Sequence, residues 1–533
     1  MAIHIIQIDY IHKYKYILRF LLYFLYIHKQ FSTFAALLNC FNDFTGNFTF
    51  QFLFSISKGM KIYRHEVSWG WLAVLIGIIV VSILGLRTEV KDGLFELGST
   101  HIWANVAWMI TATIFVLMMT PGLSFFYGGM VRKKNVISTM LQSFIVMGFV
   151  SVLWVVFGFG LAFGDDICHV IGNPVDFFMM RNVGVGNVTD PASEASQIGL
   201  VTTTIPLALF ALFQMKFAII TPSLITGAFA ERVHFSGYLL FMMLWTILVY
   251  CPLAHCTWHP DGLFGMLHVH DYAGGIVVHA ASGIAAMVGA MFLGKREDGG
   301  AGNKPANVPF VLLGAALLWL GWFGFNGGSS LAADGIAISA FLNTNTAAAT
   351  AMVTWITLDA VRGRKPSAMG AAIGAVVGLV AITPCAGWVT VGQSIFIALV
   401  ITVCCNLAVS WKSYSKVLDD ALDVFPTHGL GGIIGTLLTG IFAYDFFAQN
   451  DPDMISRGEF FFNHVLVMAG VFVYTFAMSW LLYWITDKIV PMRVSKWNEH
   501  VGLDASQHNE EYENAVSMEL PTESDWIRST EEN

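Results

Sequence analysis

The sequence contains few charged residues. Asp, Glu, Lys and Arg together make up 12% of its 533 residues, against roughly 25% in an average soluble domain. Apolar residues make up 56%, and the mean hydropathy is +0.65. This composition excludes an ordinary soluble protein and predicts an all-α polytopic membrane protein.

Other signatures are missing as well. The seven cysteines form no CxxC pair and no regular framework, and no basic run suggests a nucleic-acid partner. The net charge of -8 is spread over loops and an acidic tail. Because no carboxylate pair, nucleophile elbow or phosphate loop is present, we expect neither an enzyme nor a cofactor.

The beginning of the chain differs from the remainder. Residues 1–59 are rich in Ile, Tyr, Phe, His and Lys, and we expect them to be an upstream or non-native extension, with the true start at Met60. Residues 60–101 begin with basic residues ahead of an apolar run, as a signal sequence does. No A-x-A cleavage site is obvious, so this segment is expected to be a cleaved signal or an uncleaved anchor, followed by a short outer segment.

Apolar runs from residue 102 onward predict eleven membrane spans. Residues 102–489 are therefore expected to form the transmembrane domain, and residues 490–533 a cytosolic C-terminal tail. The predicted spans are 103–129, 136–163, 198–228, 234–256, 272–293, 308–328, 336–361, 368–386, 392–411, 428–444 and 461–488.

The connections between these spans alternate in charge. One set holds most of the basic residues, and the other holds mainly acids such as Asp165, Asp166 and Asp176. The positive-inside rule then places the N-terminus of the first span outside and the C-terminal tail in the cytoplasm, for a protein of the plasma or inner membrane. The basic set is Arg132, Lys133, Lys134, Arg232, Lys295, Arg296, Lys304, Arg362, Arg364, Lys365, Lys412 and Lys416.

One apolar stretch contains an ionisable residue that the rest of the sequence has to accommodate. It runs from Asp271 to Arg296, and His279 is the one ionisable side chain in its apolar interior. At about 1.5 Å per residue, His279 lies roughly 12 Å beyond Asp271, close to the middle of a bilayer. An ionisable group at that depth predicts a functional role and a buried partner.

Short similar segments occur at corresponding positions in the two halves of the chain. The fifth and tenth spans share GGIV at 274–277 and GGII at 431–434, and the first and sixth share FYGG at 126–129 and FNGG at 325–328. Opposite senses of the paired spans favour two five-helix inverted repeats plus a final helix. Generic packing of glycine pairs in membrane helices is the alternative.

The tenth span supplies the partner for His279. His428 lies at its start and approaches the midplane from the inner side, whereas His279 approaches from the outer side. Two imidazoles in contact satisfy each other by a hydrogen bond, and the pair can accept or pass a proton. For each histidine alone, a satisfied core residue or an interfacial side chain remains the alternative.

At these residues the chain resembles the ammonium transporter family, which includes bacterial, fungal and plant ammonium transporters and, more distantly, the Rhesus proteins. The resemblance runs from about residue 102 to Tyr512 and is closest to the ammonium-transporter subgroup. Besides 271–296, it rests on TPGLSFFYGGMVRKKNV (120–136), FQMKFAIITPSLITGAFAERVHFSG (213–237), LGWFGFNGGSS (320–330) and DDALDVFPTHGLGGIIG (419–435).

The resemblance implies a homotrimer in which each protomer has its own pore. It implies an outer ammonium recruitment site at Trp258, Ser329 and Phe217, and a gate of stacked rings at Phe217 and Phe325, with Phe213 one turn before Phe217. It further implies twin pore histidines at His279 and His428, and structural support from Asp271.

Each of these residues also has an ordinary interpretation. Taken alone, the phenylalanines would be packing residues, Trp258 a membrane-belt tryptophan, Ser329 a loop or capping serine, and Asp271 a helix N-cap. The outer loop between the fourth and fifth spans holds further histidines and Cys256, but without the spacing of a closed metal site, so we expect interfacial side chains and no metal. These histidines are His255, His259, His268 and His270.

Some residues depart from the family pattern. Lys216 replaces an apolar residue one position before Phe217, and His259-Pro260-Asp261 follow Trp258 where glycines are common. The tail 492–515 resembles the cytosolic region under which nitrogen-signalling proteins of the PII class dock, although Asn509 stands where glycine is usual. These departures bear on affinity and regulation more than on identity.

The expected function is ammonium transport. Ammonium would bind at the outer aromatic site, lose its proton and cross as ammonia, with or without the proton, through an apolar pore lined by the two histidines. An ammonium sensor acting through a separate partner is the alternative from another class. A Rhesus-like gas channel is disfavoured by Trp258 and Ser329.

Overall fold

The computed structural model describes residues 77, 80, 100–184, 205–297, 304–412 and 418–512. The chain divides into two units, Met1–Ile83 and Leu84–Asn533. In the first unit, Gly77 and Val80 are described, and both are helical. The expected extension 1–59 and nearly all of the signal-like segment 60–101 therefore lie outside the described residues.

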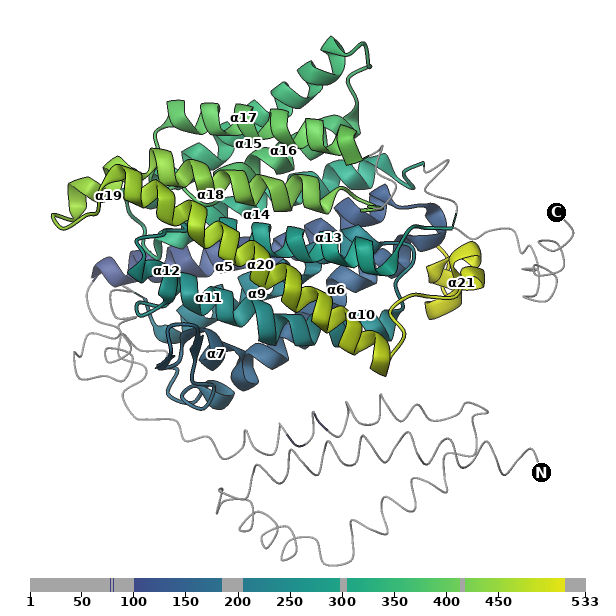
Figure 1. Cartoon of the computed structure of the whole chain (residues 1–533), viewed down its shortest axis with the longest axis horizontal. Coiled ribbons are helices and arrows are strands. Elements are labelled where there is room, and N and C mark those ends of the chain that lie inside the picture. Colours follow the sequence, from purple (N-terminus) through teal and green to yellow (C-terminus); the bar gives the residue numbers. More distant parts are fainter. Residues whose placement is uncertain are drawn as a thin grey trace, which may run out of the picture. The chain divides into compact units, whose positions relative to one another are not determined.

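The described part of the second unit is helical, apart from one two-stranded antiparallel hairpin in which Asp166 pairs with Gly172 (Figure 1). The elements are α5 (Thr100–Met130), η3 (Lys133–Asn135), α6 (Val136–Leu153), η4 (Trp154–Gly158), α7 (Phe159–Phe163), β1 (Asp166–Ile167), β2 (Ile171–Gly172), η5 (Phe178–Met180), α9 (Leu207–Ile225), η7 (Thr226–Phe229), α10 (Phe235–Trp245), η8 (Thr246–Tyr250), α11 (Cys251–Trp258), α12 (Leu263–Met266), η9 (Gly275–Ala280), α13 (Ala281–Leu293), α14 (Val308–Gly327), η10 (Gly328–Ser330), α15 (Gly335–Val361), α16 (Ala368–Ile382), α17 (Val391–Lys412), η11 (Phe425–Gly429), α18 (Leu430–Phe442), α19 (Tyr444–Asn450), α20 (Arg457–Ile489), α21 (Lys496–Val501) and η12 (Asp504–His508).

The helices agree with the predicted spans. Among the described residues, ten helices are long and apolar enough to cross a membrane, and Ala368–Ile382 is a shorter apolar helix at the predicted eighth span. The third span differs, because its helix begins at Leu207 and not at 198. Pro206 directly precedes that helix in an extended conformation (ψ 141°), a position where its missing backbone N–H costs the helix no hydrogen bond.

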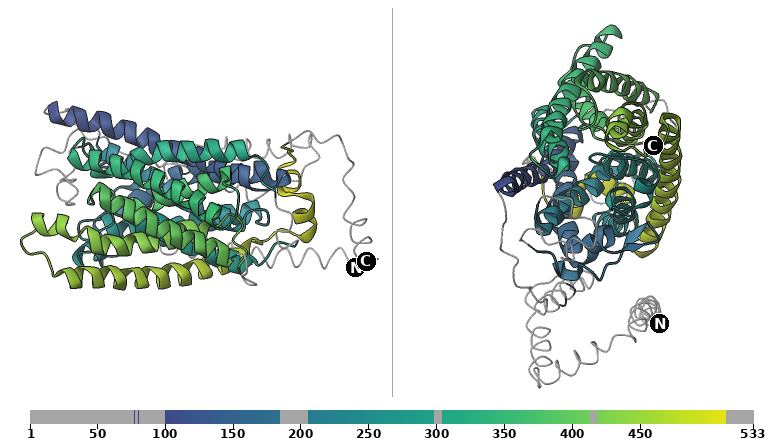
Figure 2. Two further views of the ribbon diagram at one scale, coloured as in Figure 1. Left: turned by 90° about the horizontal axis from the view of Figure 1, so that it is seen from above. Right: turned by 90° about the vertical axis from the view of Figure 1, so that its left-hand side faces the viewer.

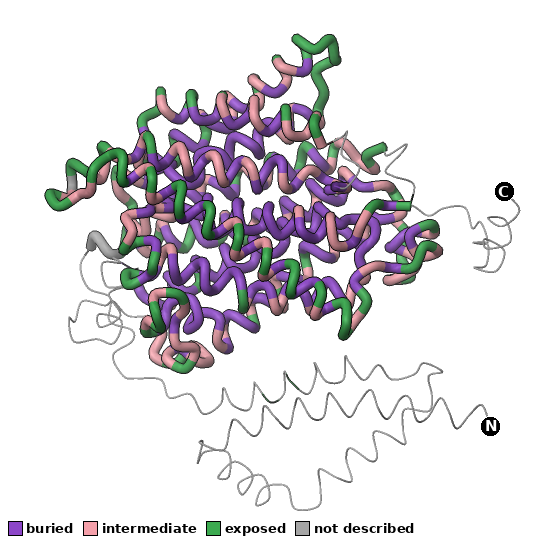
Figure 3. Tube along the Cα trace, in the orientation of Figure 1, coloured by how far each residue is buried: buried purple, intermediate pink, exposed green. Residues whose placement is uncertain are grey.

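The helices of the second unit run broadly side by side, and α20 lies obliquely along its outside (Figures 1 and 2). Small residues allow close approach of helices, as they commonly do in membranes. A Cβ added at Gly314 of α14 would lie 2.3 Å from the backbone nitrogen of Phe126 in α5. Buried residues run through the middle of the helices, and exposed residues gather at the helix ends and on the outer helices (Figure 3).

The fifth and tenth spans cross antiparallel at two glycine contacts. A Cβ at Gly283 would lie 2.1 Å from the nitrogen of Gly429, and one at Gly432 would lie 2.7 Å from the carbonyl oxygen of Gly275. No side chain fits between these backbones. The contact therefore holds the helical segments that carry His279 and His428 against each other.

The described part of the C-terminal tail packs against the connection between the first two spans. The Asp504 carboxylate accepts the backbone N–H groups of Ile137 and Ser138 at 3.0 and 2.7 Å, which caps the first turn of α6. The N–H of Leu503 donates to the side-chain oxygen of Asn135 at 2.8 Å. These bonds attach the tail to the loop between the first two spans.

Candidate substrate site and pore

Two histidines meet at the centre of the bundle, as the sequence predicts. The Nδ1 atoms of His279 and His428 are 3.3 Å apart, and both side chains are buried. In such a contact one Nδ1 carries the hydrogen and donates it, while the other accepts, so the two rings hold different tautomers. The Nε2 atom of His279 is buried without a hydrogen-bond partner.

The histidine pair borders a narrow apolar cavity of about 10 Å³, near the lower limit for one water-sized molecule. The indole of Trp322 stacks on His279 at 5.3 Å between ring centroids. The cavity therefore has room for one molecule of about the size of water. The cavity is lined by Met119, Leu123, Phe126, Ile220, Leu224, Val278, His279, Leu318, Trp322, Phe325, Val376 and His428.

Each histidine follows a carboxylate by eight residues. The Asp271 carboxylate accepts backbone N–H groups of residues 274 to 277, at distances from 2.7 to 3.4 Å. The Asp420 carboxylate accepts those of Val424 and Phe425 at 3.1 and 2.8 Å. Both carboxylates hold the first turn of a π-helical segment, η9 with His279 or η11 with His428. Asp271 and Asp420 thus make equivalent contacts at the starts of η9 and η11, and the sequence interpretation did not identify Asp420.

The carboxylate of Asp271 is used for hydrogen bonds to the backbone. Burial raises the pKa of its carboxyl group to about 6, while the four backbone N–H groups favour the ionised form and limit that rise. Both carboxylate oxygens are occupied by these donors. The backbone carbonyl oxygen of Asp271 also accepts the indole N–H of Trp258 at 3.0 Å, which fixes the orientation of that indole.

The predicted aromatic residues come together next to this cavity. The rings of Phe217 and Phe325 stack, with centroids 4.2 Å apart and planes at 20°. Trp258 packs edge-on to Phe217 at 5.9 Å, and Phe213 does so at 4.9 Å. The ring of Phe325 lies 6.0 Å from that of His279. The aromatic residues therefore form a continuous series from the end of α11 to the histidine pair.

Ser329 lies one helical turn beyond Phe325. Its hydroxyl donates to the carbonyl oxygen of Phe325 at 2.8 Å, and the side chain is half-buried. Because the hydroxyl hydrogen is used in this bond, the oxygen lone pairs remain available to accept a hydrogen bond from a cation.

His255 makes polar contacts with residues that are far from it in the sequence. Both ring nitrogens of His255 face acceptors, namely the carbonyl oxygen of Ala162 at 3.0 Å and the Asp166 carboxylate at 2.9 Å. His169 also contacts Asp166, at 3.2 Å. His259 stacks on His255 at 4.3 Å between ring centroids. This cluster attaches the β1–β2 hairpin to α11, directly next to Trp258.

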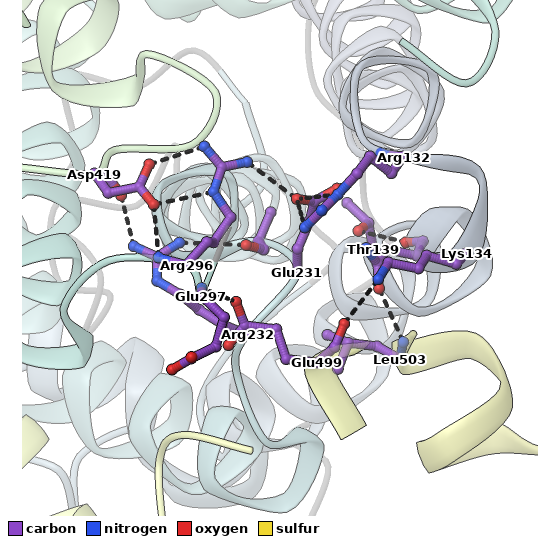
Figure 4. Close-up of polar contacts among 12 residues, drawn as sticks. Arg132, Lys134, Thr139, Glu231, Arg232, Arg296, Glu297, Asp419, Glu499 and Leu503 are labelled. Atoms are coloured by element: carbon purple, nitrogen blue, oxygen red, sulfur yellow. Dashed lines mark hydrogen bonds and ion pairs between the residues drawn. The ribbon is translucent and has the colours of Figure 1, made fainter. Parts of the chain in front are cut away.

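The connections between the spans hold a charged cluster of four residues, Arg132, Glu231, Arg296 and Asp419 (Figure 4). Arg132 and Arg296 bind the Glu231 carboxylate at 2.7 and 3.0 Å, and Arg296 also binds Asp419 at 2.8 Å. Burial opposes ionisation of Asp419, but the hydrogen bond from Arg296 and the charges of Arg232 and Arg296 lower its pKa to about 2. The cluster joins the end of the fifth span to the segment that leads into the tenth.

Comparisons with known proteins agree with this geometry. Residues 107–513 match the model of the Ammonium Transporter Family. The chain is 42% identical over 408 residues to the ammonium transporter of Bacillus subtilis, covering 76% of this chain and 97% of the relative. It is 43% identical over 413 residues to a putative ammonium transporter of Methanothermobacter thermautotrophicus, with the same coverage.

Solved structures give the same result. The crystal structure of Saccharomyces cerevisiae Mep2 aligns with a TM-score of 0.69 at 33% identity, covering 81% of this chain and 97% of that one. A structure described as a sensor Amt protein aligns with a TM-score of 0.67 at 30% identity, covering 76% and 99%. The chain is a multi-pass helical protein with the histidine pair, and it is similar to these proteins along its transmembrane domain. It therefore belongs to the ammonium transporter family, whose members are transporters and not enzymes.

Proposed function

We propose that this transporter recruits ammonium at Trp258, Ser329 and Phe217, removes its proton, and conducts ammonia past His279 and His428. The observation that carries the proposal is the 3.3 Å contact between the two buried imidazoles beside a cavity of about 10 Å³. A hydrated ion does not fit there, whereas one ammonia molecule does.

The recruitment step uses aromatic faces and a hydroxyl. A cation next to Trp258 and Phe217 gains about 0.5 to 2 kcal/mol from each ring face, more when it is desolvated. Ser329 adds a hydrogen-bond acceptor, because its own hydrogen is donated to Phe325. With no carboxylate as a direct ligand, the site binds ammonium weakly enough to release it.

The stacked rings of Phe217 and Phe325 serve as the gate. At 4.2 Å between centroids they leave no space for a molecule between them. One ring has to turn for the substrate to pass, and Phe213, which packs edge-on to Phe217, limits that movement.

Selectivity against potassium follows from the apolar pore. Below the gate, the cavity offers no oxygen atoms to replace the hydration shell of a metal ion. Ammonium differs from potassium because it can give up a proton and continue as a neutral molecule. Because one ring donates from Nδ1 to the other, one Nε2 atom of the pair accepts a hydrogen bond from ammonia and the other Nε2–H group donates one to it. The two tautomers give the proton a route of its own.

Transport in reconstituted protein tests this proposal. In solid-supported membrane electrophysiology, an ammonium pulse is expected to give a current when the proton follows the ammonia. When ammonia crosses alone, the expected result is a change in internal pH without current. Binding without either signal would support the sensor alternative and contradict the transport mechanism.

The assembly and orientation belong to the same proposal. We place the C-terminal tail in the cytoplasm of the plasma or inner membrane, supported by the basic residues at that end of the spans. A homotrimer would cover exposed apolar side chains such as Ile338, Phe341 and Phe396. A regulatory protein of the PII class would bind at the cytosolic face. Cross-linking of the reconstituted protein and a binding assay with such a protein test these two points.

A further inference from the structure

Lys216 is a basic residue in the middle of α9, inside a membrane-spanning helix. It is 9% exposed, so it reaches little solvent or lipid. A charged side chain at such a depth is costly and usually serves a function. The recruitment site, the gate and the histidine pair do not use it.

The helical positions of α9 place Lys216 at the edge of the pore-facing side. Consecutive residues are separated by about 100°. Phe217, Ile220 and Leu224 face the gate and the pore cavity, and Lys216 lies roughly 70° from the centre of that face. Leu212, about 40° farther round, is 41% exposed. The lysine thus stands between the pore side and the outer side of the helix.

The ammonium group of Lys216 has only a weak partner among the described residues. Its Nζ atom lies 3.6 Å from the sulfur of Met215, a poor acceptor. In the described parts of the chain, no carboxylate lies within ion-pair distance of Nζ. Its positive charge is therefore not neutralised within these parts of the protomer, one residue from the gate phenylalanine.

A charge in this environment acts on other cations over several ångströms. At an effective dielectric constant of about 20, two unit charges about 10 Å apart repel enough to weaken binding roughly tenfold. A neutral ammonia molecule is not subject to this repulsion. We propose that Lys216 is a specificity-determining residue that lowers the affinity of the outer site for ammonium and opposes the entry of cations into the gate, while leaving ammonia conduction unchanged. This inference rests on the recruitment site proposed above.

The test compares charge-removing and charge-retaining variants in proteoliposomes. Lys216→Met and Lys216→Gln remove the charge, Lys216→Arg keeps it, and Leu212→Met alters the same side of α9 without changing charge. The probe is ammonium chloride, with current measured by solid-supported membrane electrophysiology and ammonia flux by stopped-flow pH change. Size-exclusion chromatography verifies that each variant is folded.

The proposal expects Lys216→Met and Lys216→Gln to lower the half-saturating ammonium concentration several-fold, up to about tenfold, with unchanged ammonia flux. Lys216→Arg and Leu212→Met should behave as the wild type. Because a charge inside the membrane is little screened, the difference should persist at high salt. Equal half-saturation in the wild type and both charge-removing variants would overturn the role of Lys216. Absence of both current and flux in the wild type would instead contradict the transport proposal itself.

Discussion

His279 and His428 hold their Nδ1 atoms 3.3 Å apart at the antiparallel crossing of two spans, so a single hydrogen is shared between them. This relationship depends on the glycines at the crossing, which let the two backbones touch, and on a capping carboxylate ahead of each histidine. The pair is therefore fixed from both sides, as a defined hydrogen-bond geometry in a pore requires.

The aromatic ring at position 217 can be tested by removing its π-face. Phe217→Leu keeps an apolar side chain but loses the cation-π contact, so the half-saturating ammonium concentration should rise between about twofold and thirtyfold. Phe217→Tyr, which keeps the ring, is the control. Equal affinities of the leucine variant and the wild type, measured by current, would argue against recruitment at this ring.

The hydroxyl of Ser329 can be compared with that of its neighbour. Ser329→Ala removes an acceptor for a cation and should weaken ammonium binding at least about tenfold, since a hydrogen bond to a charged group contributes about 1.5 to 3 kcal/mol. Ser330→Ala is the matched control, because the Ser330 hydroxyl bonds to the backbone of Gly327 and Ala332. A larger effect at Ser330 than at Ser329 would contradict the assignment.

The capping role of Asp271 predicts a loss of stability. Asp271→Ala leaves up to four buried N–H groups without their acceptor and should lower the free energy of unfolding by about 3 kcal/mol or more. Asp334 accepts one N–H at the start of α15, so Asp334→Ala should cost about 1 kcal/mol. Thermal unfolding followed by fluorescence-detected size-exclusion chromatography gives the comparison. The account fails if the two variants lose the same stability.

The charged cluster of Arg132, Glu231, Arg296 and Asp419 predicts a loss of stability in acid. The pKa of Asp419 is lowered to about 2 in the folded protein, below its ordinary value near 3.9. Its contribution is therefore complete above pH of about 4 and is lost as the pH falls toward about 2. After allowance for solvent screening we expect about 1 to 2 kcal/mol. Asp419→Asn should unfold more easily at pH 7 and show a smaller further loss on acidification; an unchanged pH profile would refute this.

The sequence was sufficient to predict the membrane spans and the contact between the two histidines. Long apolar runs determine the spans, because the bilayer admits little else, and an isolated histidine within such a run stands out by its cost. The third span began later than expected, at Leu207, since the apolar average did not give weight to Pro206 at the helix start.

Other features depended on three-dimensional contacts. Asp420 was missed as the counterpart of Asp271, although both precede a histidine by eight residues, and the similar segments of the two halves could have identified it. The contact of Asp166 with His255 joins residues 89 positions apart, which local pattern does not reveal. The π-helical form of η9 and η11 also escaped prediction, because a segment of five or six residues is too short for its apolar pattern to distinguish a π-helical turn from an α-helical one.

The most direct test is solid-supported membrane electrophysiology on the reconstituted wild type and His279→Ala, with ammonium and potassium pulses of equal concentration. If the proton passes through the histidine pair, the wild type should give a current with ammonium and none with potassium. The ammonium current of His279→Ala should then be reduced at least tenfold. An undiminished ammonium current in His279→Ala would contradict proton transfer through the histidine pair. A potassium current equal to that of ammonium would contradict deprotonation as the basis of selectivity.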